Sequence, residues 1–146
     1  FLPKKLTFAI ELKEEGIEKE VFNIIKKYAI HDNIYITSFN YKALENMRKI
    51  DSNIKLSWLI EEKINKNNID KLLKINGTQI CPKADNVTKD DIKLANKSGI
   101  KVRLWGVLNE KTMESVYNLN IDGMTVNFPD KLKHLMEVND DGKNTK

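Results

Sequence analysis

A repeat of short apolar segments limits the fold of this chain more than any other feature. Six runs rich in apolar and β-branched residues recur about 20 to 28 residues apart, beginning near Leu6, Ile34, Ile54, Thr78, Val102 and Gly123. Each run is as long as a β-strand, and the segments between the runs are long enough for helices. This alternation predicts an α/β fold with a parallel sheet.

The segments between the runs show helical periodicity. Apolar residues recur at intervals of three and four residues in 17–28 and again in 44–50. Thr88 followed by Asp91 resembles a capping box, and we expect the helix that it opens to stop at Ser98-Gly99, where glycine supplies the left-handed turn. The sequence therefore predicts amphipathic helices in all three places.

The composition of the strands indicates how the sheet is covered. Segments such as 35–39 and 104–107 are apolar nearly throughout, which is typical of parallel strands covered on both faces. Six strands fit either an open doubly wound sheet or most of a (β/α)₈ barrel, and their short, even spacing favours the barrel. A complete barrel has eight units and typically ~250 residues. We therefore expect an incomplete TIM barrel of about six of the eight units over residues 1–138, and a mobile tail over 139–146.

Composition and charge exclude several classes of protein. Apolar residues make up 40% of the 146 residues and charged residues 32%, a balance unlike that of disordered or fibrous chains. Apolar stretches are too short for a stable membrane span, and no signal-peptide pattern is present. The net charge of +4 arises from intermixed acidic and basic residues without interleaved aromatics, so we expect no nucleic-acid partner. A single cysteine, Cys81, leaves both a cytoplasmic and a secreted location open.

Polar and aromatic residues follow several strands at the ends where barrel enzymes keep their chemistry. The strand ends carry Glu11 and Lys13, Ser38 and Phe39, Trp58, Cys81 and Pro82, Trp105, and Asn127. A carboxylate can ligate a metal or act as a base, and a neighbouring lysine can neutralise a phosphate. Glu11 and Lys13 can therefore be interpreted either as an exposed ion pair without a function or as part of a functional site.

Other reactive residues have more ordinary interpretations. Tryptophans in apolar strands commonly lie in the core, and Cys81, without a nearby histidine, is expected to be a small buried residue. His31 precedes a strand, at the end opposite the barrel mouth, and His134 belongs to a polar C-terminal helix, so neither is placed for catalysis. The sequence contains no Gly-rich loop, CxxC or HExxH motif, and thus no nucleotide or zinc motif.

Several short motifs occur together in a characteristic order. They are Ile10-Glu11-Leu12-Lys13, Ile36-Thr37-Ser38-Phe39-Asn40, Ile80-Cys81-Pro82, and residues 98–107 and 121–130. Over roughly residues 6 to 132, this order and spacing resemble the C-terminal two thirds of a glycerophosphodiester phosphodiesterase domain. The resemblance implies a TIM barrel of the PLC-like phosphodiesterase type. It also implies hydrolysis of glycerophosphodiesters such as glycerophosphocholine to glycerol 3-phosphate and an alcohol.

The resemblance also implies roles for individual residues. Glu11 corresponds to one of three carboxylates that hold one divalent cation, Mg²⁺ or Ca²⁺, and Lys13 to a residue that faces the substrate phosphate. Trp105 corresponds to an aromatic side chain that lines the substrate pocket, and Phe39 is a second candidate for that wall. These assignments agree with the preference of hard cations for oxygen ligands.

The chain departs from the family pattern in three respects. The family's His-Arg-Gly motif, two further metal carboxylates and a second catalytic histidine would all lie upstream of Phe1, so we expect no catalytic residue in this chain and no activity from it alone. Leu108 and Asn127 replace a frequent asparagine and aspartate. Finally, the strands through Glu11 and Val126 would have open edges, so we expect an upstream segment or a second chain to complete the barrel.

Two other functions stay open. A non-catalytic phosphate- or glycan-binding module derived from the same barrel would need none of the missing histidines. A barrel enzyme that uses Lys13 for a Schiff base is less favoured, because a lysine beside a carboxylate remains protonated.

Overall fold

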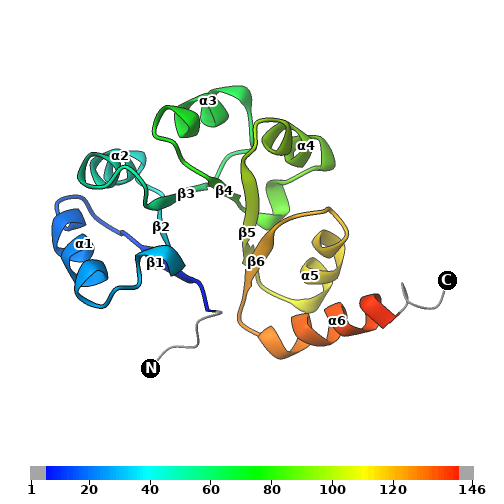
Figure 1. Cartoon of the computed structure of the whole chain (residues 1–146). Helices are drawn as coiled ribbons and strands as arrows, with labels where there is room; N and C mark the ends of the chain where they lie inside the picture. Colours follow the sequence, from blue (N-terminus) through cyan, green and yellow to red (C-terminus); the bar gives the residue numbers. More distant parts are fainter. Residues whose placement is uncertain (1–5, 142–146) are drawn as a thin grey trace.

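The computed structural model of the chain describes residues 6–141. Within them, strands and helices alternate from end to end (Figure 1). The strands are β1 (Phe8–Glu11), β2 (Ile34–Ser38), β3 (Lys55–Ile60), β4 (Gln79–Pro82), β5 (Lys101–Val107) and β6 (Gly123–Val126). The helices are α1 (Glu18–Lys27), α2 (Tyr41–Ile50), α3 (Lys66–Lys74), α4 (Lys89–Lys97), α5 (Glu110–Tyr117) and α6 (Pro129–Asp141), with 3₁₀ turns at His31–Asn33 and Ala84–Asn86.

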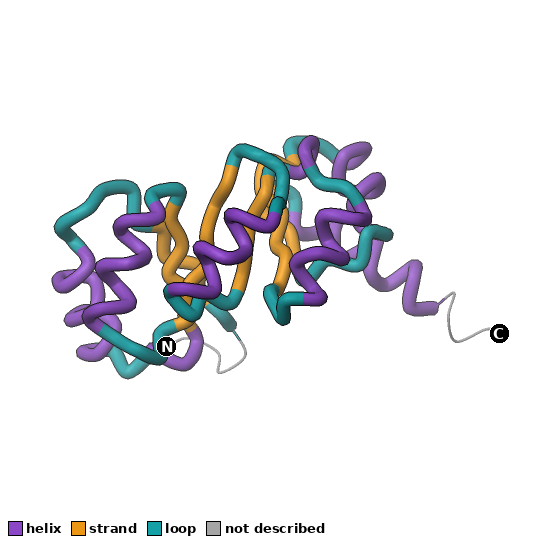
Figure 2. The backbone as a smooth tube through the Cα atoms, turned by 90° about the horizontal axis from the view of Figure 1, so that it is seen from above, coloured by secondary structure: helices purple, strands orange, loops and turns teal. Residues whose placement is uncertain are grey.

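The six strands form one parallel sheet in which spatial order equals chain order, β1-β2-β3-β4-β5-β6. The sheet curls, and helices cover its outer, convex side (Figures 1 and 2). β1 and β6 lie at the two ends of this sheet, and an open side separates them (Figure 1). The predicted α/β fold with a parallel, incompletely closed barrel is therefore confirmed.

The hydrophobic core lies between the sheet and the helices. Ile34 and Ile36 of β2 and Leu56 of β3 are fully buried there, against the buried Leu44 and Met47 of α2. Burying an aliphatic side chain of this size stabilises the fold by about 1.5–3 kcal/mol. Since successive side chains of a strand point to opposite faces, the alternate residues of each strand face the interior of the barrel.

Local sequence signals account for the helix boundaries. Segments 17–28 and 44–50 form α1 and α2, as their periodicity predicts. α4 begins with the predicted capping box between Thr88 and Asp91 and ends at Ser98 and Gly99, where Gly99 has a φ of 71°. Because α6 continues to Asp141, the first three residues of the predicted tail 139–146 are helical. Residues 142–146 of that tail lie outside the described part of the chain.

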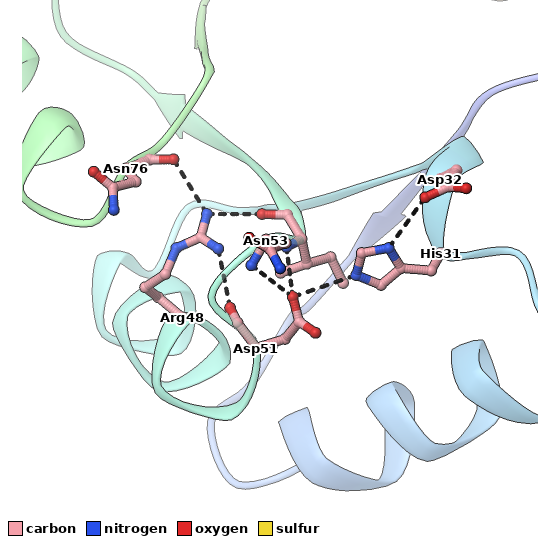
Figure 3. Close-up of polar contacts among 7 residues, drawn as sticks. His31, Asp32, Arg48, Asp51, Asn53 and Asn76 are labelled. Atoms are coloured by element: carbon pink, nitrogen blue, oxygen red, sulfur yellow. Dashed lines mark hydrogen bonds and ion pairs between the residues drawn. The ribbon is translucent and has the colours of Figure 1, made fainter.

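The amino ends of the strands are held by a polar network (Figure 3). The Arg48 guanidinium donates to the carbonyl oxygens of Asp51, Ile54, Ile75 and Asn76 at 2.7–3.1 Å. Asp51 accepts from the backbone N–H groups of Asn53 and Ile54 at 2.8 and 2.6 Å, and its carboxylate lies 3.3 Å from His31. His31 is therefore a structural residue opposite the barrel mouth, as the sequence predicts.

No helix within residues 6–141 combines the length and the apolar character that crossing a bilayer requires.

Candidate active site

A cavity of about 450 Å³ opens at the carboxyl ends of the strands. It is lined by inward-facing residues of β1, β2, β3, β5 and β6 and by the segments that follow two of these strands: Ala9, Glu11, Thr37, Phe39, Leu59, Arg103, Trp105, Gly106, Leu108 and Thr125. Three of the four sequence-predicted site residues, Glu11, Phe39 and Trp105, are in this set. The cavity lies where barrel enzymes carry their active sites.

Glu11 and Lys13 form a loose ion pair at the rim of this cavity. The Lys13 ammonium lies 3.9 Å from a Glu11 carboxylate oxygen, and the two side chains are 79% and 37% exposed. A pair this open to water contributes at most about 1 kcal/mol to stability. Glu11 lines the cavity but Lys13 does not. Because the ion pair is weak, the Lys13 amine can leave it and move toward a ligand at modest energetic cost.

Phe39 and Trp105 form an aromatic wall across the mouth. Their rings meet edge to face, with centroids 5.2 Å apart and an interplanar angle of 86°. The Trp105 indole N–H donates to the carbonyl oxygen of Ile60 at 3.1 Å, which fixes the ring in the cavity wall. Trp105 is half-buried and lines the cavity, and its contact with a substrate stays a prediction.

Ser38 holds the strand end that carries Glu11. Its hydroxyl donates to the carbonyl oxygen of Leu12 at 2.6 Å and accepts from the backbone N–H of Asn40 at 3.0 Å. The Leu12 N–H in turn donates to the carbonyl oxygen of Thr37 at 2.8 Å. Ser38 is fully buried, so it positions the site without facing it.

The remaining strand-end candidates lie away from the cavity. Trp58 is 8% exposed and packs against Tyr41 with ring centroids 4.9 Å apart, and Pro82 is buried as well. Cys81 is fully buried, and burial raises the pKa of its thiol, although neighbouring Arg103 opposes the shift. The sequence-based interpretation of Cys81 as a small buried residue is thus confirmed. Asn127, directly after β6, is exposed.

A polar layer beneath the aromatic wall was missed by sequence reasoning. Ser57 donates to the side-chain oxygen of Gln79 at 2.8 Å, and Arg103 donates to the same oxygen at 3.2 Å and to the Thr125 hydroxyl at 2.6 Å. These residues lie on β3, β4, β5 and β6, outside the segments 35–39 and 104–107 that exemplify the apolar strands. The available signal was the single polar residue between apolar neighbours, as in Val102-Arg103-Leu104.

The described residues offer only part of a metal site. No group of three or more His, Cys, Asp or Glu side chains in the range 6–141 could hold a cation. Glu11 is the one acidic side chain among the residues that line the cavity. An oxygen-preferring divalent cation would thus find one ligand here and would need further ligands from outside this set.

Comparison with known proteins agrees with this geometry. Residues 2–131 match the model of the glycerophosphoryl diester phosphodiesterase family. The glycerophosphodiester phosphodiesterase of Caldanaerobacter subterraneus subsp. tengcongensis is 24% identical over 121 residues, which cover 83% of this chain and 49% of that protein. The glycerophosphodiester phosphodiesterase of Bacillus altitudinis is 27% identical over 134 residues, which cover 88% and 55%. The chain spans about half the length of these curated relatives.

Solved structures share the fold. A glycerophosphodiester phosphodiesterase from Parabacteroides distasonis superposes with a TM-score of 0.80 at 16% identity, covering 93% of this chain and 59% of that one. An Oleispira antarctica phosphodiesterase in complex with the product sn-glycerol-3-phosphate gives a TM-score of 0.75 at 18% identity, covering 90% and 55%. With its family match over most of its length, and with TIM-barrel phosphodiesterases as structural neighbours, the chain belongs to the glycerophosphoryl diester phosphodiesterase family.

Proposed function

We propose that this chain forms the larger part of the barrel, and one portion of the active site, of an enzyme that hydrolyses glycerophosphodiesters to glycerol 3-phosphate and an alcohol. The observation that carries the proposal is the convergence of Glu11, Phe39 and Trp105 on one cavity at the mouth of the partial barrel. These residues come from β1, β5 and the segment after β2, far apart in sequence. A carboxylate that can hold a cation, together with an aromatic wall, suits a substrate with an anionic end and a carbon-rich end.

Each residue has a distinct part in this proposal. Glu11 gives one oxygen ligand to a divalent cation, Mg²⁺ or Ca²⁺, and Lys13 approaches the phosphate from the rim. When bound, such a cation polarises a phosphoryl oxygen and offsets the charge that develops during hydrolysis. Phe39 and Trp105 hold the carbon skeleton of the substrate against the cavity wall.

The proposal includes two further β/α units between β1 and β6. The open side of the sheet leaves the outer edges of both strands without a partner strand in the part of the chain described. An upstream segment of the same polypeptide, or a second chain, fills this side and brings the remaining metal ligands and the general acid and base. The chain without these units is expected to be inactive.

A comparison of hydrolysis rates tests the proposal. The chain, joined to the segment that completes its barrel, is assayed on glycerophosphocholine with Mg²⁺ or Ca²⁺, beside its Glu11→Gln variant. Because the cation contributes several kcal/mol of transition-state stabilisation, we expect the variant to lose about 100-fold or more in kcat. Glu20→Gln, which changes an exposed carboxylate on α1, is the matched control and is expected to keep full activity.

Equal rates for Glu11→Gln and the unchanged protein would remove Glu11 from the mechanism. Saturable binding of the substrate without turnover in the completed protein would instead support a non-catalytic phosphate-binding module.

A further inference from the structure

Arg103 occupies an unusual place inside the partial barrel. It lies on β5, two residues before Trp105 and therefore on the same, inward face of the strand. Its side chain lines the cavity that contains Glu11 and also a second cavity of about 400 Å³ toward the amino ends of the strands. Arg103 thus lies between the two cavities, at the floor of the one that contains Glu11.

The guanidinium is held in place by neutral groups. Its Nε–H donates to Gln79 at 3.2 Å and one Nη1–H donates to Thr125 at 2.6 Å. Gln79 is itself fixed by Ser57, whose hydroxyl donates to the same side-chain oxygen at 2.8 Å. Two of the five N–H groups of Arg103 therefore have protein acceptors among residues 6–141, and the charge is oriented but not neutralised.

No carboxylate in the described part of the chain lies within ion-pair distance of Arg103. A cation on an inner barrel face without a counter-charge is unfavourable, and it becomes more so as the barrel closes and excludes water. The fork of N–H donors in a guanidinium matches the paired oxygens of a phosphate or carboxylate. The unpaired charge and the free N–H donors of Arg103 therefore favour a bound anion.

Thr37 gives a second, independent indication. It lines the same cavity from β2, and its side chain is 97% buried, with a relative exposure of 3%. Its hydroxyl oxygen is buried and has no hydrogen-bond partner among residues 6–141. A buried hydroxyl left without a partner costs about 1–3 kcal/mol, and rotation of the Thr37 side chain toward the cavity would let the hydroxyl donate to a ligand there.

We propose that Arg103 and Thr37 form an anion subsite at the floor of the cavity, which binds the non-bridging phosphoryl oxygens of the substrate. Arg103 supplies two N–H donors to the phosphate, and Thr37 supplies one O–H donor. Lys13 is exposed at the rim and approaches the phosphate from there, whereas Arg103 meets it from the floor of the cavity. In naming this anion as the substrate phosphate, the inference rests on the proposed function.

Chemical modification of the unchanged protein tests the subsite without any variant. The sequence contains two arginines, Arg48 and Arg103, and Arg48 lies in the network at the opposite ends of the strands. Phenylglyoxal labelling, read by mass spectrometry, is carried out with and without 10–20 mM inorganic phosphate or sn-glycerol 3-phosphate, in the presence of EDTA, with glycerol as the neutral control. We expect both phosphates to slow the labelling of Arg103 about tenfold, leaving Arg48 unchanged, and we expect no effect of glycerol.

Calorimetric titration of the same anions then separates the subsite from general electrostatics. Arg103→Gln is expected to weaken binding of sn-glycerol 3-phosphate about tenfold or more, and Thr37→Val about threefold or more, in line with the loss of charged and neutral hydrogen bonds. Arg103→Lys, which keeps the charge but loses the fork, is expected to lie between Arg103→Gln and the unchanged protein. Lys101→Gln removes an exposed charge on the same strand, from a side chain that lines only the second cavity and not the one that contains Glu11, and it is expected to bind normally.

Three results would overturn the inference: labelling of Arg103 unaffected by either phosphate, equal affinity in Arg103→Gln and the unchanged protein, or an equal loss in Lys101→Gln. Unchanged anion affinity together with a lower melting temperature of Arg103→Gln would assign Arg103 a structural role only. Because metal is chelated and no turnover is measured, failure of the proposed hydrolysis leaves these readouts intact.

Discussion

The Ser38 hydroxyl donates a hydrogen bond of 2.6 Å to the carbonyl oxygen of Leu12 and thereby ties the end of β2 to the end of β1. Leu12 is 2% exposed and lies between Glu11 and Lys13 in sequence. The contact therefore sets the direction in which the chain leaves β1. It makes Ser38 the support of the strand end that carries both charged residues.

Replacing Ser38 tests this support. Ser38→Ala leaves the Leu12 carbonyl and the Asn40 N–H without their buried partner, so we expect a loss of about 1–3 kcal/mol in the free energy of unfolding. Urea denaturation measures it. Ser115→Ala, which removes an exposed hydroxyl on α5, should change stability by less than about 0.5 kcal/mol. A Ser38→Ala protein as stable as the parent would contradict the assignment.

Gly106 is expected to resist substitution because of its backbone conformation. It interrupts the register between β5 and β6, with a φ of 73°, and lines the cavity beside Trp105. An L-residue in this left-handed region costs about 1–2 kcal/mol, so Gly106→Ala should lower the urea midpoint accordingly. Gly123→Ala is the control, since a Cβ there would make an ordinary contact of 3.7 Å with Arg103. Equal stability of the two variants would argue against strain at Gly106.

The two tryptophans should respond differently to truncation. Trp58 is buried in the core, whereas Trp105 is half-buried in the cavity wall. Trp58→Ala is expected to destabilise the fold by about 3–5 kcal/mol. Trp105→Ala should cost less stability but weaken substrate binding, since its ring faces the cavity and packs on Phe39. Denaturation and substrate titration of both variants measure these effects; the reverse ranking in stability would refute the assignment.

Asp51 should make stability depend on pH in the acidic range. Burial raises the pKa of its carboxyl, but the hydrogen bonds from Asn53 and Ile54 and the contact with His31 outweigh it, and the pKa is lowered overall. A lowered pKa in the folded state means that this stabilisation is complete above the unfolded value of about 3.9 and is lost as the pH falls below it.

Unfolding of Asp51→Asn measures this contribution. We expect the variant to be less stable than the parent by about 1–2 kcal/mol at neutral pH, with the difference shrinking as the pH falls below about 4. The exposed Asp70→Asn on α3 is the control and should show no such pattern. A stability difference that stays constant from pH 7 to pH 3 would show that the ionised carboxylate is not the stabilising form.

Much of the fold follows from local sequence. Five of the six strands begin within one residue of their predicted starts, and β1 begins at Phe8 where Leu6 was expected. Strand starts are well marked because apolar runs and turn residues alternate sharply along the chain. The capping box at Thr88 and Asp91 was equally clear, since it depends on residues three positions apart.

The site was harder to predict than the fold. Strand ends identify Glu11, Phe39 and Trp105 because chain position alone brings them to one edge of the sheet. The Arg103 cluster depends on side chains that are more than twenty residues apart and meet only when β4, β5 and β6 pair side by side. Ser38 positions the end of β1 through a hydrogen bond from β2, and no local sequence pattern predicts a contact between residues so far apart in the chain.

The order of the strands has a consequence for how the molecule assembles. Each strand pairs with the strand that precedes it in the chain, so no contact within the sheet has to wait for a distant segment. During synthesis each unit can dock on a finished neighbour as it leaves the ribosome, and the loops closed at each step stay short. This order would let the sheet form one strand at a time, each new strand pairing with the free edge of the strand before it.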